Sequence, residues 1–265
     1  MRTTGTTGTA RQIRDAGRNR RVRLAAASAA VLPALLLAAA CSSNSSDANG
    51  GSKTAPPASS APAGGAPLTK AQLTSALVSA KDVPGYTVQV SQTDATDAQD
   101  DATLTADKAA CQPLADITSS KPQIKRVAFV GAAFAKTPAT SGSTTPAEID
   151  QMLVASHAPG DAQKVIDSVD TALGTCTSFN ATDNTGTKTP FSITKAPAVS
   201  AGDASASYVM TDTADKANGA ALVTVVRTGD TITAYLSVKS AGGAGTLPLD
   251  VARKQSDKLK AAQAK

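Results

Sequence analysis

Hydrophobic and polar residues follow two different periods along the chain, and these periods predict its helices and strands. In the first helical stretch, Leu73, Leu77 and Val78 share one face, and Thr69 with Gln72 can form a capping box at its start. Helical spacing also covers residues 106–117, residues 161–176 and the chain from about residue 248 onward. Alternation predicts strands at 86–90, 127–135, 149–156, 191–198, 205–213, 220–228 and 231–240.

The order of these elements predicts a single α+β domain that spans residues 68–265. Gly229-Asp230 has the composition of a two-residue hairpin turn between the last two strands, because glycine can adopt positive φ. Residues 149–156 fit either a helix or a strand, and we favour the strand. Consecutive strands with helices at the start, middle and end of the domain indicate an antiparallel β-sheet packed by helices.

The first 40 residues follow a different pattern. An arginine-rich head is followed by an apolar run at 24–40 and then by Cys41. This order is typical of a secretory signal peptide. The apolar run has 17 residues, which is shorter than the roughly 20 that a membrane-spanning helix needs. Arg20-Arg21 also fits twin-arginine export, so the export route stays open.

Cys41 is the informative residue of this segment. Residues 37–41 read Leu-Ala-Ala-Ala-Cys, which resembles the bacterial lipobox, where cleavage precedes a cysteine that carries diacylglycerol. We therefore interpret residues 1–40 as a lipoprotein signal peptide and Cys41 as the site of lipidation, with palmitate as an expected acyl group. The alternative is an ordinary secretory signal that happens to end at a cysteine. Several acyl chains would anchor the mature protein to the extracellular face of the cell membrane without spanning it.

Residues 41–67 are rich in serine, glycine, alanine and proline. Such a composition cannot bury enough apolar area to offset the entropy of ordering, so we predict a disordered tether. The tether would hold the domain roughly 30 Å from the membrane, from the usual scaling of flexible chains with length.

The charge of the whole chain, +5, belongs to the signal peptide. The first 40 residues contain seven arginines and one aspartate. Of the 26 Lys+Arg and 21 Asp+Glu in the chain, 19 and 20 remain after cleavage, a net charge of −1. The mature protein therefore lacks the electrostatic footprint of a nucleic-acid-binding protein, and we expect no nucleic acid among its partners.

Two cysteines remain once Cys41 is assigned to lipid. Cys111 lies in the short helical stretch at 106–117, and Cys176 ends the buried face of the helix that starts at residue 161. An even pair in an exported protein predicts one disulfide, here closing a loop of 65 residues and contributing about 4 kcal/mol in the chain-entropy model. The alternative is two separate buried thiols.

The sequence offers no catalytic or metal-binding constellation. His157 is the single histidine, no Gly-x-Ser-x-Gly motif occurs, and a zinc site would need clustered Cys and His. We expect His157 to be solvated near a loop. Asp94, Asp97, Asp100 and Asp101 lack the alternate spacing and the glycine of a calcium loop, so we interpret them as a solvated loop. We accordingly expect no metal and no cofactor.

Five segments of the domain carry a family resemblance. They read LTKAQLTSALVSAKDVPGY, AACQPLADI, ALGTCTSF, AGDASASY and VVRTGDTITAYLSV. These segments resemble actinobacterial secreted lipoproteins and are similar to the extracellular sensor domain of PknH-type Ser/Thr kinases. The resemblance implies a single α+β domain with an antiparallel sheet and a ligand-binding surface cleft, and it brings no enzymatic activity with it. The cysteines that match the family are Cys111 and Cys176, whereas the kinase sensors carry two disulfides.

These observations favour a lipid-anchored, extracytoplasmic ligand-binding or sensor-type lipoprotein without catalytic activity. Its ligand would be a small molecule, a lipid or an envelope protein, and the sequence does not place the binding cleft. The alternative is a cell-envelope scaffold that contacts peptidoglycan or another envelope protein through the edge of its sheet. An enzyme that uses His157 is the third hypothesis.

We predict that Cys41→Ser releases the exported protein from the membrane, because the thiol is the atom that would accept the lipid. Fractionation of cells followed by immunoblotting measures the membrane-bound share of each variant. Ser45→Ala in the tether is the control and should stay in the membrane fraction. Retention of the Cys41→Ser protein at the wild-type level would contradict lipidation at this residue.

Overall fold

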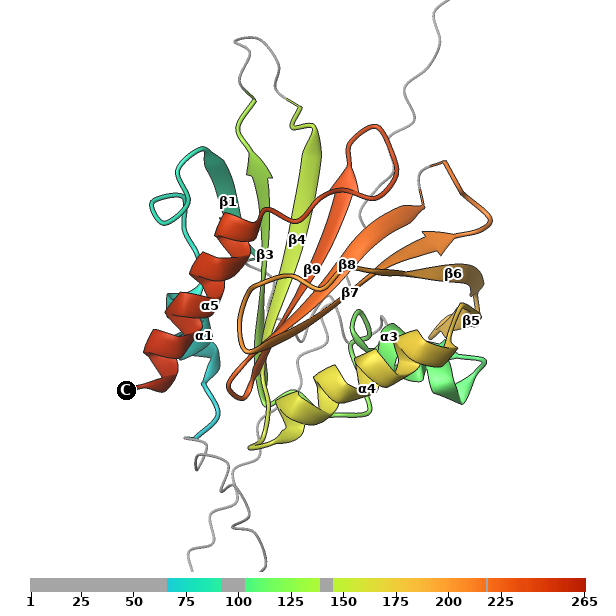
Figure 1. The fold of residues 1–265 in the computed structure, drawn as a ribbon, viewed down its shortest axis with the longest axis horizontal. Helices are drawn as coiled ribbons and strands as arrows, with labels where there is room; N and C mark the ends of the chain where they lie inside the picture. Colours follow the sequence, from blue (N-terminus) through green and yellow to red (C-terminus); the bar gives the residue numbers. More distant parts are fainter. Residues whose placement is uncertain (1–65, 92–102, 139–144, 218) are drawn as a thin grey trace, which may run out of the picture. The chain divides into compact units, whose positions relative to one another are not determined.

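The computed structural model describes residues 66–91, 103–138, 145–217 and 219–265. Figure 1 shows this part of the chain as one twisted sheet with helices packed against it. The predicted α+β class with an antiparallel sheet is confirmed. The expected signal peptide, Cys41, the tether up to residue 65 and the four aspartates of the acidic stretch at 94–101 lie outside the described residues.

Nine strands of the described chain form one antiparallel sheet in the order β1-β3-β4-β9-β8-β7-β6-β5-β2. The strands are β1 (Tyr86–Val90), β2 (Leu104–Ala106), β3 (Ala128–Lys136), β4 (Glu148–Ser156), β5 (Ser178–Asp183), β6 (Lys188–Ala196), β7 (Ala204–Asp212), β8 (Ala220–Thr228) and β9 (Thr231–Lys239). The segment 149–156 is thus a strand, as we favoured. Gly229 takes φ of 57° in the tight turn between β8 and β9, where the sequence predicts a hairpin.

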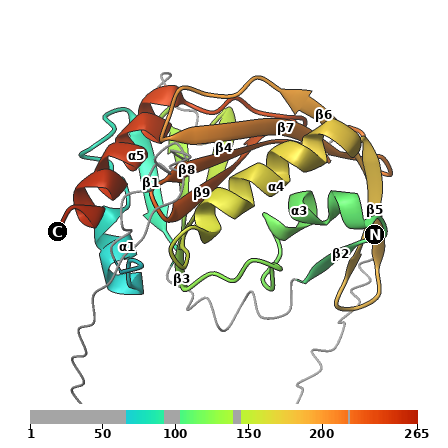
Figure 2. The ribbon, with the colours of Figure 1, turned by 60° about the horizontal axis from the view of Figure 1, so that its bottom comes forward.

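The helices form two groups on the sheet. They are α1 (Lys70–Ala76), the 3-10 turn η1 (Ala109–Cys111), α3 (Gln112–Asp116), α4 (Asp161–Thr175) and α5 (Leu249–Gln263). Both views place α1 beside α5 and α3 beside α4 (Figures 1 and 2). The central strands send alternate side chains to opposite faces. Met152 and Tyr235 therefore join the core under α1 and α5, whereas Tyr208, Val223 and Ile232 join the core under α3 and α4.

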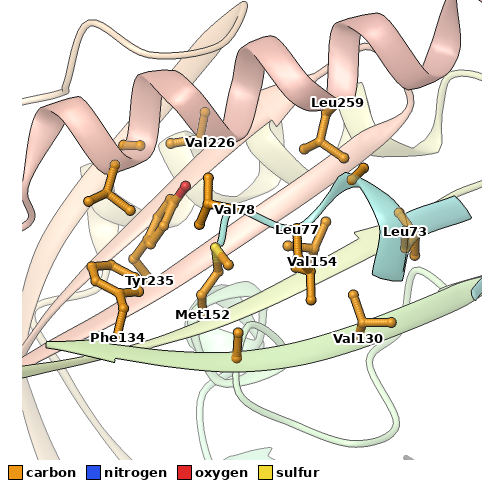
Figure 3. Packing of buried hydrophobic residues seen from close by; sticks show 14 of the residues in the cluster. Leu73, Leu77, Val78, Val130, Phe134, Met152, Val154, Val226, Tyr235 and Leu259 are labelled. Carbon is orange, nitrogen blue, oxygen red and sulfur yellow. The ribbon is translucent and has the colours of Figure 1, made fainter. Parts of the chain in front are cut away.

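The core under α1 and α5 is fixed by packing and by one buried amide. Figure 3 shows Val78 near the ring of Tyr235 and Leu259 farther along the same core, on the side of Leu77. The side chain of Gln255 in α5 is fully buried, and it accepts a hydrogen bond from the Val78 N–H (2.9 Å) and donates to the Ala76 carbonyl (3.0 Å). Buried backbone groups need hydrogen-bond partners. The amide of Gln255 supplies them for Ala76 and Val78, so α1 can end inside the core.

Cys111 and Cys176 form a disulfide in the core under α3 and α4. Cys111 ends η1, directly before α3, and Cys176 directly follows α4. The bond therefore joins the beginning of the short helix to the end of the long one.

Two strands were not predicted from the sequence. β2 has three residues and β5 reads Ser-Phe-Asn-Ala-Thr-Asp, so neither has a long apolar alternation. They pair with each other at one edge of the sheet, and β5 also pairs with β6. No helix in the described ranges is both long and apolar enough to cross a bilayer.

One acidic side chain is buried on the α1/α5 face. Asp150 on β4 is 2 % exposed and accepts a short hydrogen bond from the Ser237 hydroxyl on β9. Burial raises the pKa of this carboxyl to about 6, against the opposing effect of the Ser237 hydrogen bond, and the nearby Glu148 raises it further. The folded protein thus holds a proton on Asp150 at a pH where the unfolded chain has released it.

We predict that Asp150→Asn stabilises the protein at neutral pH and that the gain shrinks as pH falls. A raised folded-state pKa means that stability is lost as pH rises from about 4 to about 6, because the buried carboxyl must ionise. Asparagine keeps an acceptor for Ser237 without that cost. The gain in unfolding free energy should approach about 3 kcal/mol at pH 7.5 as an upper bound.

Urea unfolding at pH 7.5 and pH 4 measures this difference. Asp257→Asn changes an exposed aspartate of α5 and serves as the control for the loss of one negative charge. An equal effect of the two substitutions, or a gain from Asp150→Asn that does not depend on pH, would contradict a buried, protonated carboxyl.

Candidate functional site

A groove of about 640 Å³ lies on the sheet face that α3 and α4 share, across β1, β3, β4 and β9. Side chains of this face form its floor: Phe129, Gly131, Ala133, Gln151, Leu153, Ala234 and Leu236. We call this cavity the groove. Its volume falls in the range of about 300–1,000 Å³ that is usual for small-molecule sites.

Small residues make the groove hollow. Gly131 on β3 stands opposite Leu153 on β4, which stands opposite Ala234 on β9. Directly opposite residues of antiparallel strands point to the same face, so these three form one row across the floor. In the neighbouring row Ala133 stands opposite Gln151. A glycine and two alanines thus lower the floor between larger side chains.

The opposite face of the same strands belongs to the close-packed core under α1 and α5. Phe134, Met152 and Tyr235 alternate with the floor residues and are each at most 2 % exposed. Figure 3 shows these three side chains packed together on the α1/α5 side. The floor therefore cannot deepen or collapse without disturbing a packed core.

The margin of the groove is polar. Gln89 is exposed, and Lys70, Ser91 and Thr118 also line the cavity, while the exposed Gln151 is one polar side chain within the floor. Apolar floor with polar margins is the usual composition of a site for a ligand that has both kinds of surface.

A second cavity of about 80 Å³ adjoins the groove; we call it the annex. It lies between α4 and the segment 117–127, which Figure 2 shows returning from α3 to the start of β3. Ile117, Leu153 and Ala234 line both cavities. Because three lining residues are shared, the groove and the annex are adjacent cavities, and we call the two together the cleft.

Arg126 lines the annex and places its guanidinium beside the groove. Its Nη1 donates to the Ser119 carbonyl (2.8 Å), and its Nη2 donates to the carbonyls of Asp116 and Ile117 (3.1 Å each). The guanidinium carbon lies 5.8 Å from the ring centroid of Phe129 on the groove floor. Burial lowers the pKa of Arg126 to about 10, so the side chain is still a cation at neutral pH.

His157 also lines the annex, and the prediction that it is solvated is wrong. The residue is 2 % exposed, because the segment 117–127 and the start of α4 cover the end of β4. Its Nδ1 lies 3.1 Å from the Lys125 carbonyl. Burial is the largest cause that lowers the pKa of the imidazole, which is therefore neutral at pH 7. Within the described chain, its ring forms no hydrogen bond to a nucleophile or a carboxylate.

The other candidate groups do not meet at the groove. Asp150 points to the opposite face of the sheet. Both thiols of the described chain belong to the Cys111–Cys176 disulfide. The described residues contain no group of three or more His, Cys, Asp or Glu that could hold a metal ion.

Sequence reasoning placed none of the groove residues. A signal was present in the strand at 127–135, because its apolar alternation is interrupted by Gly131 and Ala133 on one face. The cross-strand partners Leu153 and Ala234 could not be known without the register. Arg126 was missed because nothing in its local sequence shows that the chain folds back onto α3.

Comparison with known proteins identifies one family. The family model for the PknH-like extracellular domain matches residues 68–258. Among solved structures, the extracellular domain of PknH from Mycobacterium tuberculosis matches with 10 % identity and a TM-score of 0.47, covering 75 % of this chain and 97 % of that chain. The Rv0999 ortholog from Mycobacterium smegmatis matches with 12 % identity and a TM-score of 0.26, covering 73 % and 93 %. No curated protein matches the chain.

Proposed function

Because the chain belongs to the PknH-like extracellular domain family, we propose that it is an extracytoplasmic ligand-binding module whose binding site is the groove. The family is one of extracellular domains, which supports a position outside the cytoplasm. The groove supplies what binding needs, namely a preformed hollow with an apolar floor and polar margins.

The observation that carries this proposal is the apolar floor that the described helices leave uncovered. A sheet face is normally either packed by helices or lined by polar side chains in contact with water. Here Phe129, Leu153 and Leu236 are half-buried on a face whose other half lies under α3 and α4. Exposed apolar surface in a concave setting costs free energy until a ligand covers it.

Lipid anchoring is the second part of the proposal. Diacylglycerol on Cys41 and the tether at 41–67 would hold the domain at the outer face of the cell membrane. A module tethered there reaches envelope lipids, small molecules in the envelope and neighbouring membrane proteins.

We propose that the module acts by binding and not by catalysis. Among the described residues that line the groove, the titratable ones are Lys70 and Tyr235. The ring of Tyr235 points into the opposite core, as Figure 3 shows, and burial raises its pKa. General acid–base catalysis needs a proton donor and acceptor within hydrogen-bond reach of a substrate. The groove lining supports no such pair.

The scaffold alternative rests on the edge of the sheet. β1 is an edge strand of five residues, and its last residue Val90 is 41 % exposed. A partner that adds a strand there would use backbone hydrogen bonds and would not need the hollow of the groove.

We predict that Ala133→Leu weakens ligand binding, because the larger side chain fills the hollow between Gln89 and Gln151. The probe is the neutral dye N-phenyl-1-naphthylamine, whose fluorescence rises in apolar surroundings. It is added to the full chain carrying Cys41→Ser, which removes the expected lipid. The affinity of the dye should fall at least about tenfold, the effect of losing about 1.4 kcal/mol.

Ala135→Leu is the control, because Ala135 lies two residues along the same strand, on the same face, outside the groove lining. It should bind the dye as the parent protein does. Absence of dye binding by the parent, or equal binding by both variants, would refute the groove as the ligand site and leave the sheet-edge scaffold as the better account.

A further inference from the structure

The annex differs from the groove in being lined by a guanidinium, that of Arg126. The Leu153–Ala234 pair and Ile117 lie where the groove meets the annex. The groove floor is mainly apolar. Most of the annex lining is apolar as well, but Arg126, Gln123, Ser168, Asp116 and the neutral His157 also line it. A ligand that spans both cavities therefore meets mainly apolar side chains along its length and the cation of Arg126 in the annex.

Arg126 retains hydrogen-bonding capacity. A guanidinium has five N–H donors, and the hydrogen bonds of Arg126 within the described chain go to three carbonyl oxygens. At least two donors therefore remain for a further acceptor. The fork of a guanidinium matches a carboxylate or a phosphate better than any neutral group.

Among the residues that the structure describes, none forms an ion pair with Arg126. No carboxylate of the described residues lies within 4.0 Å of its guanidinium. Asp116 contributes an attractive field, but its oxygens accept hydrogen bonds from Gln112 Nε2 (2.7 Å) and from the Gln123 N–H (3.0 Å). Lys121 and Lys125 are exposed on the same segment and add positive charge near the annex.

We propose that the cleft binds an amphiphile that has an acyl chain and a compact anionic headgroup, with the headgroup at Arg126 and the chain along the groove floor. The inference rests on the proposed function, since it assigns a ligand class to the same groove. The volumes of the two cavities limit the size of the headgroup and of the chain. An annex of about 80 Å³ admits a carboxylate or a phosphate but not a sugar, and a groove of about 640 Å³ admits a chain.

Burial makes the headgroup selective. Arg126 is half-buried beside the Phe129 ring, and the charge of a half-buried cation interacts more strongly with an anion than the charge of an exposed one does. A hydrogen bond to a charged group contributes about 1.5–3 kcal/mol, which corresponds to a preference of about tenfold to a hundredfold over a neutral headgroup.

The first experiment measures this preference in the unaltered cleft. Four competitors displace N-phenyl-1-naphthylamine from the full chain carrying Cys41→Ser: palmitate, palmitoyl lysophosphatidic acid, monopalmitoylglycerol and inorganic phosphate. Palmitate and the lysophospholipid should compete at least tenfold better than monopalmitoylglycerol. Inorganic phosphate should compete poorly, because it lacks the chain. Whichever of palmitate and the lysophospholipid competes better shows whether the site favours a carboxylate or a phosphate headgroup.

The second experiment removes the cation. Arg126→Gln should weaken binding of the two anionic amphiphiles about tenfold or more and leave monopalmitoylglycerol unchanged. Arg126→Lys keeps a positive charge and should retain part of the preference. Arg253→Gln removes a cation from the exposed face of α5 and is the control for net charge. Since Arg126 also binds the carbonyls at the end of α3, thermal unfolding of each variant checks that the fold is kept.

The outcomes separate the two proposals. If the dye binds and the anionic and neutral amphiphiles compete equally, or if Arg126→Gln lowers both affinities alike, the headgroup assignment is wrong and the groove remains a binding site. If the dye binds and no acyl amphiphile displaces it, the ligand class is wrong. If the dye does not bind in the groove, the proposed function fails and the headgroup assignment fails with it.

Discussion

The Cys111–Cys176 disulfide is the constraint on which the candidate site depends. It joins the start of α3 to the end of α4 across 65 residues of sequence, so the two helices are held together over one half of the sheet. On this face, the other half of the sheet, across β1, β3 and β4, is then left without a covering helix among the described elements, whereas α1 and α5 cover the opposite face. The chain must also return from the end of α3 to the start of β3. That return, at 117–127, forms one wall of the annex and carries Arg126 into it.

A second dependence links the hollow face to the packed face. Every residue that lowers the groove floor has neighbours in sequence that fill the core under α1 and α5, as Gly131 and Ala133 do with Ala132 and Phe134. The buried amide of Gln255 keeps α5 over that core. Because the back of the floor is close-packed, the groove exists before a ligand arrives, and binding need not include the cost of opening it.

Local periodicity predicted most of the fold and little of the site, for a physical reason. A helix or strand leaves its period in its own sequence, so α4, α5 and the hairpin at Gly229 could be predicted. β2 and β5 could not, because a short polar strand is stabilised by its partners and not by its own alternation. The burial of His157 depends on a chain reversal far along the sequence, and the floor pair Leu153 and Ala234 depends on register. Neither is a property of a local stretch.

The charge of the chain shows why the electrostatics of the cleft must be local. The cationic excess of the sequence lies in its first 40 residues, and the remainder carries a net charge of −1. Such a domain has no long-range field to attract anions, and exposed charges are screened beyond about 10 Å at 0.1 M salt. Arg126 differs because it is half-buried, where screening is weaker than at the surface. Selection of an anionic headgroup would then arise from contact inside the annex, and it would persist at salt concentrations that abolish binding by surface lysines.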